Sequence, residues 1–131
     1  MLIMALFTRM FLVLQVIGQL LRYDLVAAVC GFSGNYRGLR RCACRRQSRP
    51  ELEQTICQTV ADVTAFYCKR VRCLQRSVVT ARVLRAYGIA AELVIGYRLA
   101  PPMSHAWVEV GGRVVNDSAG YQRKLSLLER I

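Results

Sequence analysis

The sequence has few acidic residues for its size. Only 8 Asp and Glu stand against 19 Lys and Arg, which gives a formal net charge of +11. An excess of this size is typical of proteins that meet nucleic acid, an anionic membrane surface or an acidic partner. The basic residues are concentrated, because residues 37–49 and residues 68–88 each hold six and no acid. The charge therefore belongs to two segments and not to the whole chain.

The sequence also lacks a nucleic-acid-binding motif, an internal repeat and any low-complexity tract. Its aromatic residues are not interleaved with the two basic segments, as they would be in a typical nucleic-acid surface. We therefore expect no nucleic-acid partner. The 131 residues suit one domain, and a composition of 54% hydrophobic and 21% charged residues excludes a disordered chain.

Metal-ligand spacing is missing as well. Cys42 and Cys44 are separated by one residue, which is shorter than the usual C-x₂₋₄-C zinc spacing, and the chain has a single histidine. We therefore expect no metal site and no cofactor. The cysteines Cys30, Cys57 and Cys68 show no pairing pattern either, which favours a reduced, cytoplasmic compartment over a secreted disulfide framework.

The apolar N-terminal segment, residues 1–22, lacks the marks of a secretory signal. No basic stretch precedes the apolar run and no A-x-A cleavage site follows it, so we do not expect export. Polar residues also interrupt it, so a true membrane span is the least favoured of its alternatives. Four of them fall near one helical face: Thr8, Gln15, Gln19 and Arg22. This pattern predicts an amphipathic helix that packs, docks a partner or lies on a membrane surface.

Periodicity predicts helices first and strands afterwards. Pro50 is favoured at a first helical position and begins a helix to about residue 70, after a glycine-rich loop over residues 31–38. A further helix starts near Cys73 and ends where Gly88 takes a left-handed conformation. The period then changes to two, predicting strands over residues 91–99, 105–110 and 113–117. This order indicates an α+β fold with N-terminal helices followed by a small antiparallel sheet.

Three residues form a candidate for nucleophilic catalysis. His105, the single histidine, stands on a predicted strand with Cys73 upstream and Asp117 downstream. At a helix N-terminus, unpaired backbone N–H groups and nearby basic residues favour the thiolate of Cys73 and supply part of an oxyanion hole. A buried structural thiol and a structural histidine are the competing interpretations.

Whether the acid reaches the histidine depends on the hairpin register. A two-residue turn over residues 111–112 would place Asp117 on the sheet face opposite to His105. A loop of three residues, beginning one residue earlier, instead pairs Glu109 with Arg113 and His105 with Asp117. We predict the three-residue loop, because it also sets opposite charges across from each other.

Five motifs occur in one order along the second half of the chain: CLQRS at 73–77, LRAYGIAA at 84–91, LVIGYR at 93–98, SHAWVEV at 104–110 and VVND at 114–117. Together they resemble the lasso-peptide leader peptidases, which are papain-like and transglutaminase-like cysteine peptidases of bacterial ribosomal-peptide maturation. The resemblance covers about residues 50–120. It implies a papain-like/transglutaminase-like core.

The resemblance also implies roles for the three candidate residues. Cys73 would be the nucleophile, His105 the general base and then acid, and Asp117 the orienting acid. The implied reaction hydrolyses one peptide bond and removes the leader from a lasso precursor peptide, so that a macrolactam-forming cyclase can close a ring. A transglutaminase-like acyl transferase, or a non-catalytic basic membrane-surface or interaction module, are the alternatives.

The family resemblance further implies a division of the chain and a partner. Members without a fused leader-binding domain work with a separate small leader-recognition protein, and only about 50 residues precede the peptidase motifs here. We expect residues 1–49 to form an apolar helix and an Arg-rich segment that docks this partner, and residues 50–131 to form the cysteine peptidase core. Peripheral membrane contact through residues 1–22 is a further expectation.

Overall fold

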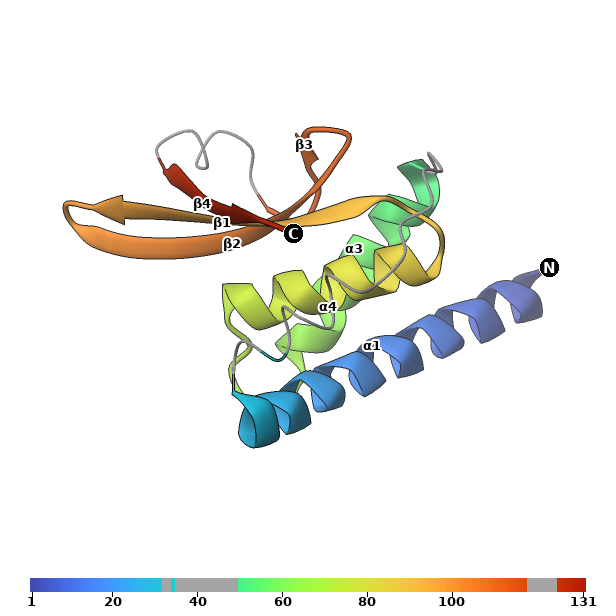
Figure 1. Cartoon of the computed structure of the whole chain (residues 1–131). Helices are drawn as coiled ribbons and strands as arrows, with labels where there is room; N and C mark the ends of the chain where they lie inside the picture. Colours follow the sequence, from blue (N-terminus) through green and yellow to red (C-terminus); the bar gives the residue numbers. More distant parts are fainter. Residues whose placement is uncertain (32–33, 35–49, 118–124) are drawn as a thin grey trace.

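Three helices precede a four-stranded antiparallel sheet in the computed structural model, which describes residues 1–31, 34, 50–117 and 125–131 (Figure 1). The helices are α1 (Leu2–Cys30), α3 (Pro50–Ala65) and α4 (Cys73–Ala86). The strands are β1 (Ala91–Leu99), β2 (Pro102–Val110), β3 (Arg113–Val114) and β4 (Ser126–Arg130), in the sheet order β3-β2-β1-β4. All three helices lie on one face of the sheet, so the predicted α+β fold is confirmed.

The hydrophobic core lies between this sheet face and the helices. Alternate residues of the two long strands point into it as buried cross-strand pairs, such as Leu93 with Val108 and Ile95 with Ala106. The helices meet them with buried aliphatic side chains: Val16 and Leu20 of α1, Ile56 and Val60 of α3, and Val78 and Leu84 of α4. Removing this apolar surface from water is the main force that holds the layers together.

Helix α4 begins and ends where the sequence predicts. Cys73 is its first residue, and Gly88 follows its C-terminus with a φ of 83°, a left-handed conformation that favours glycine. The Gly88 amide donates to the Arg85 carbonyl and the Ile89 amide to the Leu84 carbonyl, which is the Schellman pattern. Local signals therefore fix both ends of the helix that carries the candidate nucleophile.

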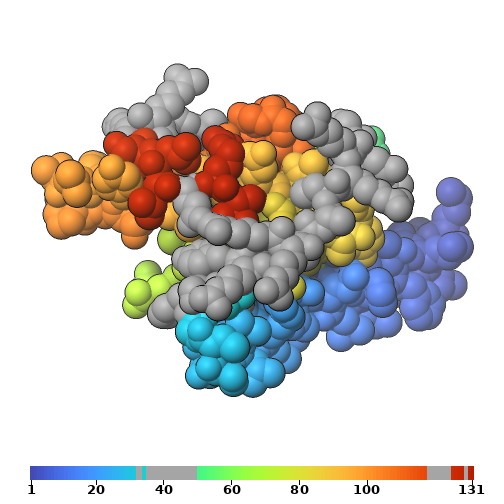
Figure 2. Space-filling view, in the orientation of Figure 1, coloured from blue at the N-terminus to red at the C-terminus, as the bar shows by residue number. Residues whose placement is uncertain are grey.

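Helix α1 is longer than predicted, since it continues to Cys30. Two residues of its predicted polar face point inward: Gln15 accepts a hydrogen bond from the Tyr87 hydroxyl at 2.5 Å, and Gln19 accepts one from Arg82 at 3.1 Å. By contrast, residues 1–11 are exposed all round although most are apolar, and they project beyond the rest of the molecule (Figure 2). By length and composition α1 is able to cross a membrane.

Helix α3 ends earlier than predicted, at Ala65. The residues that follow leave the helix and bring two side chains to Asp24 of α1: the Tyr67 hydroxyl donates to it at 2.6 Å and the Lys69 ammonium lies 2.5 Å away. Gln75 of α4 donates to the same carboxylate at 3.1 Å. Asp24 therefore joins α1, α4 and the segment between α3 and α4.

Strand β4 was not predicted. It pairs with β1, and its Leu127 and Leu128 are exposed, so no alternation of buried and exposed residues marks it as a strand. The Arg-rich segment over residues 37–49, with Cys42 and Cys44, lies outside the described residues.

Candidate functional site

The β2–β3 hairpin has a different register from the predicted one. Val110 pairs with Arg113 and Glu109 with Val114, so the turn has two residues, not three. Gly111 and Gly112 have φ values of 58° and 78°. A two-residue turn with both central residues left-handed matches the twist of the strands, and glycine adopts it without steric cost. The predicted three-residue loop is therefore wrong.

The predicted pairing of Glu109 with Arg113 does not form either. The Arg113 guanidinium instead donates to Glu53 of α3 at 3.3 Å. Glu109 accepts a hydrogen bond from the indole N–H of Trp107 at 3.1 Å and lies 3.3 Å from Arg130. The charges that favoured the longer loop thus find partners on other elements.

His105 and Asp117 nevertheless meet. The Nε2 atom of His105 is in hydrogen-bond contact with the Asp117 carboxylate, and both side chains are largely buried. The two-residue turn would place Asp117 on the opposite face only if the strand continued to it, but β3 ends at Val114. Beyond Val114 the chain bends, so the alternation of side chains along a strand no longer decides where Asp117 points.

Asn116 explains how the strand ends. The Val115 amide still donates to the Val108 carbonyl at 3.0 Å, as an antiparallel ladder requires. The Val108 amide, however, donates to the side-chain oxygen of Asn116 at 2.8 Å, which takes the place of a backbone carbonyl. Asn116 therefore replaces one ladder bond and releases the backbone at the residue before Asp117.

Ser77 of α4 occupies the next position on the same edge of β2. Backbone carbonyls two residues apart in a strand point the same way, so the Ala106 carbonyl faces the β3 side as the Val108 carbonyl does. It accepts a hydrogen bond from the buried Ser77 hydroxyl at 3.0 Å, and the Asn116 side-chain amide donates to that hydroxyl at 3.1 Å. The start of α4 is thereby tied to β2 beside His105.

Cys73 is the first residue of α4. It stands four residues, about 6 Å of helical rise, before Ser77 and is half-buried. The N-cap residue Arg72 makes no side-chain hydrogen bond to the start of α4, so it leaves the first backbone N–H groups of the helix unoccupied. The structure brings His105 and Asp117 into contact, whereas no hydrogen bond between Cys73 and His105 is seen within the described residues.

Trp107 covers the candidate histidine from the same sheet face. The rings of His105 and Trp107 stack with centroids 6.1 Å apart and an interplanar angle of 24°. Trp107 pairs with Val94 of β1, and its ring lies over the next position on that face, Gly96, where a Cβ would lie 2.8 Å from the indole ring. The stacked indole thus covers one face of the imidazole ring.

Neither Ser77 nor Asn116 was predicted to have a role, although Ser77 lies in the motif CLQRS and Asn116 in VVND. For each residue the sequence held one signal of its position near the site. Ser77 is four residues after Cys73 and so shares its helical face, and Asn116 directly precedes Asp117. Their hydrogen bonds depend on the sheet edge, which is a tertiary feature.

The arrangement suits acyl chemistry. A carboxylate that holds one ring nitrogen of a histidine orients the other ring nitrogen for proton transfer, and a helix N-terminus favours a thiolate and a developing oxyanion. The described contacts thus bring His105 and Asp117 together on β2 and the segment after β3, and place Cys73 at the start of the helix that Ser77 ties to β2.

A family model agrees with this architecture. The model of the transglutaminase-like superfamily matches residues 19–129, and the protein therefore belongs to that superfamily. The chain is also similar to the Microcin J25-processing protein McjB of Escherichia coli, with 48% identity over 59 residues. These residues are 45% of this chain and 28% of McjB, and no solved structure matches. The resemblance noted from the sequence motifs is confirmed.

Proposed function

We propose that this protein is a cysteine peptidase that removes the leader from a lasso-peptide precursor. The observation that carries the proposal is the His105–Asp117 contact at the sheet edge to which Ser77 ties the start of α4, where Cys73 stands. The similarity to a protein named for processing microcin J25 supports a role in lasso-peptide processing. The separate leader-recognition protein and the macrolactam-forming cyclase are proposed as its partners.

The proposed first half-reaction forms a thioester. The Cys73 thiolate attacks the scissile carbonyl carbon, and backbone N–H groups at the start of α4 stabilise the oxyanion. Because Asp117 contacts Nε2 of His105, the Nδ1 side of the ring delivers a proton to the leaving amine. The C–N bond then breaks, and the product with a free α-amine departs.

The second half-reaction restores the enzyme. Water loses a proton to His105 as its oxygen attacks the thioester carbon, and the C–S bond breaks. The leader leaves as a carboxylate and its acid proton passes to solvent, while the proton kept on His105 restores the thiolate–imidazolium pair from which the reaction began. Throughout, Asp117 holds the imidazole in one orientation and stabilises its protonated form.

Mass spectrometry of the precursor peptide tests the proposal. The wild-type chain, incubated with precursor and the leader-recognition protein, should release a leader fragment, and Cys73→Ala should release none. Cys68→Ala is the matched control, because Cys68 is an exposed thiol five residues from Cys73, and it should retain activity. Cleavage by Cys73→Ala at the wild-type rate would refute the assignment of Cys73 as the nucleophile.

Superfamily membership makes acyl transfer the second candidate. The two reactions share the acyl-enzyme and differ only in whether water or an amine attacks it. Adding an excess of a primary amine to the same assay separates them. A peptidase should still give the free carboxylate of the leader, whereas an acyl transferase should give the amide adduct.

A further inference from the structure

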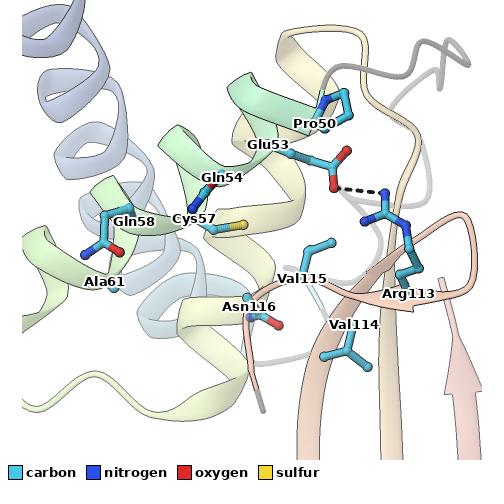
Figure 3. A pocket seen from close by; sticks show the side chains of 10 residues that line it. All are labelled: Pro50, Glu53, Gln54, Cys57, Gln58, Ala61, Arg113, Val114, Val115 and Asn116. Carbon is cyan, nitrogen blue, oxygen red and sulfur yellow. Dashed lines mark hydrogen bonds and ion pairs between the residues drawn. The ribbon is translucent and has the colours of Figure 1, made fainter. Parts of the chain in front are cut away.

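A pocket of about 520 Å³ lies between α3 and the chain segment that follows the β2–β3 turn (Figure 3). Its wall is formed by six residues of α3, and by Arg113, Val114, Val115 and Asn116 on the other side. The last of these directly precedes Asp117, so the pocket adjoins the candidate site through the chain itself. Its size is in the range of small-ligand sites, enough for one long side chain.

The pocket wall holds a buried carboxylate that is only half satisfied. Glu53 is 4% exposed, and its Oε1 accepts a hydrogen bond from Arg113 at 3.3 Å. Its Oε2 is buried and has no hydrogen-bond partner among the residues that the structure describes. Buried charged oxygens are almost always paired, because leaving one unpaired costs free energy. The vacant oxygen points to a donor that the described part of the chain does not supply.

Arg113 is a weak partner for this carboxylate. Its side chain is 61% exposed, and its contact is longer than the 2.7–2.9 Å typical of a charge-assisted hydrogen bond. An exposed arginine in a long contact contributes little free energy and is easily displaced. Figure 3 shows it reaching Glu53 from the strand side, across the pocket from the helix.

On the helix side of the pocket the charged lining residue is Glu53, and the rest of α3 adds negative charge in a protein that is otherwise strongly basic. Helix α3 carries three of the 8 acidic residues, Glu51, Glu53 and Asp62, and no lysine or arginine. Cys57, which also lines the pocket, does not add to this charge, because burial and the neighbouring Glu53 raise the pKa of its thiol to about 11. The local charge therefore favours a cationic occupant.

We propose that this pocket is a subsite that binds the guanidinium or ammonium group of a basic side chain of the peptide substrate. The inference rests on the proposed function for the identity of the peptide. The incoming cation donates to the vacant Oε2 of Glu53, and Arg113 moves into solvent. Because Asn116 forms part of the wall, occupancy of the pocket places the peptide beside Asp117 and His105.

A pair of matched probes tests the charge preference without any cleavage. Nα-acetyl-arginine N-methylamide and its citrulline counterpart have nearly the same shape, and only the first is charged. In a ¹⁵N-NMR titration of the full chain, the arginine probe should bind about tenfold more tightly and shift the amides of Gln54, Cys57 and Val115. Equal binding of the two probes would overturn the proposal.

Two variants of the ion pair make the test sharper. Glu53→Gln should abolish the preference for arginine over citrulline, while Arg113→Gln, which removes the competing guanidinium, should strengthen arginine binding about threefold or more. If Glu53 and Arg113 form only a structural pair, the two substitutions should act alike and neither probe should bind in the pocket. Unchanged amide spectra away from the pocket show that each variant is folded.

A cleavage assay then tests whether the cation comes from the substrate. Replacing the pocket-bound arginine or lysine of the peptide by a neutral analogue should raise KM with little change in kcat, and Glu53→Gln should remove the difference. If the enzyme prefers a basic over a neutral residue at none of the peptide positions, a substrate side chain is excluded as the occupant of the pocket. Failure of the proposed function would appear differently, as absent cleavage with probe binding intact.

Discussion

Burial changes how reactive a cysteine thiol is, and Cys57 is an example. It is half-buried beside Glu53, and burial, with the neighbouring carboxylate, raises the pKa of its thiol to about 11. At neutral pH it therefore remains a protonated thiol, which is a poor nucleophile. Cys68, in contrast, is exposed.

Alkylation with iodoacetamide should follow this difference. At pH 8 we expect Cys68 to react well before Cys57, and the rate at Cys57 should rise about tenfold per pH unit until pH approaches 11. Peptide mass mapping measures both rates in one sample. Glu53→Gln should speed labelling of Cys57, because the substitution removes the negative charge that opposes its ionisation. Equal rates at pH 8 would contradict the burial of this thiol.

Among the elements, α4 and β2 are joined by a small polar network that has consequences for the site. Ser77 and Asn116 are positioning residues: they touch neither His105 nor Asp117 in the contacts described, but they hold the start of α4 and the end of β3 on one edge. Loss of one buried hydrogen bond costs about 1 kcal/mol, which the fold tolerates. Its effect on geometry should be larger than its effect on stability.

Asn116→Asp separates these two effects. The variant keeps an oxygen that accepts from the Val108 amide but loses the N–H that donates to Ser77. We expect kcat for leader cleavage to fall about tenfold or more with KM little changed, and the pH profile of Cys73 alkylation to shift, while the melting temperature moves by only a few degrees. Ser77→Ala should behave similarly and Ser77→Thr should restore activity.

Thr55→Ala is the control, because Thr55 makes an exposed helical hydrogen bond away from the site. A variant of Ser77 or Asn116 with an unchanged pH profile and unchanged kcat would show that the network is structural only.

Asp24 is the corresponding link between α1 and the remaining helices. Burial raises the pKa of its carboxyl, but the hydrogen bonds from Lys69 and Tyr67 outweigh burial and hold the pKa below its usual 3.8. A carboxyl whose pKa is lower in the folded than in the unfolded chain stabilises the fold above about pH 4, and this contribution is lost as the pH falls further.

Asp24→Asn should therefore lower the free energy of unfolding at pH 7 by about 1–2 kcal/mol, discounted for the exposure of Lys69. Urea unfolding of both proteins at pH 7 and pH 3 measures the effect. The difference in free energy of unfolding between the two proteins should become smaller at pH 3, where the wild-type carboxyl takes up its proton. If the difference is the same at both pH values, the contribution of Asp24 comes from packing and not from charge.

How far the sequence predicts the structure differs between elements for physical reasons. The ends of α4 and the bounds of β1 were predictable, because Gly88 and the alternation over residues 91–99 are local signals. The contact of His105 with Asp117 was predicted with the wrong register, because the expected pairing of Glu109 with Arg113 was weighed above the local turn signal of Gly111 and Gly112. The bond from Val108 to Asn116 depends on the sheet edge and is not a local signal. The inward-pointing Gln15 depends on Tyr87, 72 residues further along the chain.

At the scale of the whole molecule, the main feature left to explain is the outer part of α1, residues 1–11, which is mostly apolar and yet exposed. Large side chains including Phe7 and Phe11 are 60% and 59% exposed, while Leu12, Val16 and Leu20 are buried in the core. The helix thus serves two purposes along its length. We propose that its outer part docks the leader-recognition protein, with membrane contact as the competing possibility.

Co-purification with the leader-recognition protein tests this docking. Deleting residues 1–45 should abolish it, and because that deletion also removes core residues, Phe7→Gln with Phe11→Gln is the milder variant and should give the same loss. Phe66→Gln is the matched control, since Phe66 is also exposed but lies beyond α3. Retained co-purification together with lost sedimentation on anionic liposomes would assign the helix to the membrane instead.

The shortness of strand β3 also bears on how easily another molecule can pair with this edge of the sheet. An uncovered edge strand offers a row of unpaired backbone groups to which another chain can add. Beyond β3, the carbonyl of Ala106 and the amide of Val108 on the edge of β2 are instead occupied by the side chains of Ser77 and Asn116. The contacts that tie α4 to β2 therefore also occupy this part of the edge against strand addition, so that substituting them risks aggregation as well as displacement of α4.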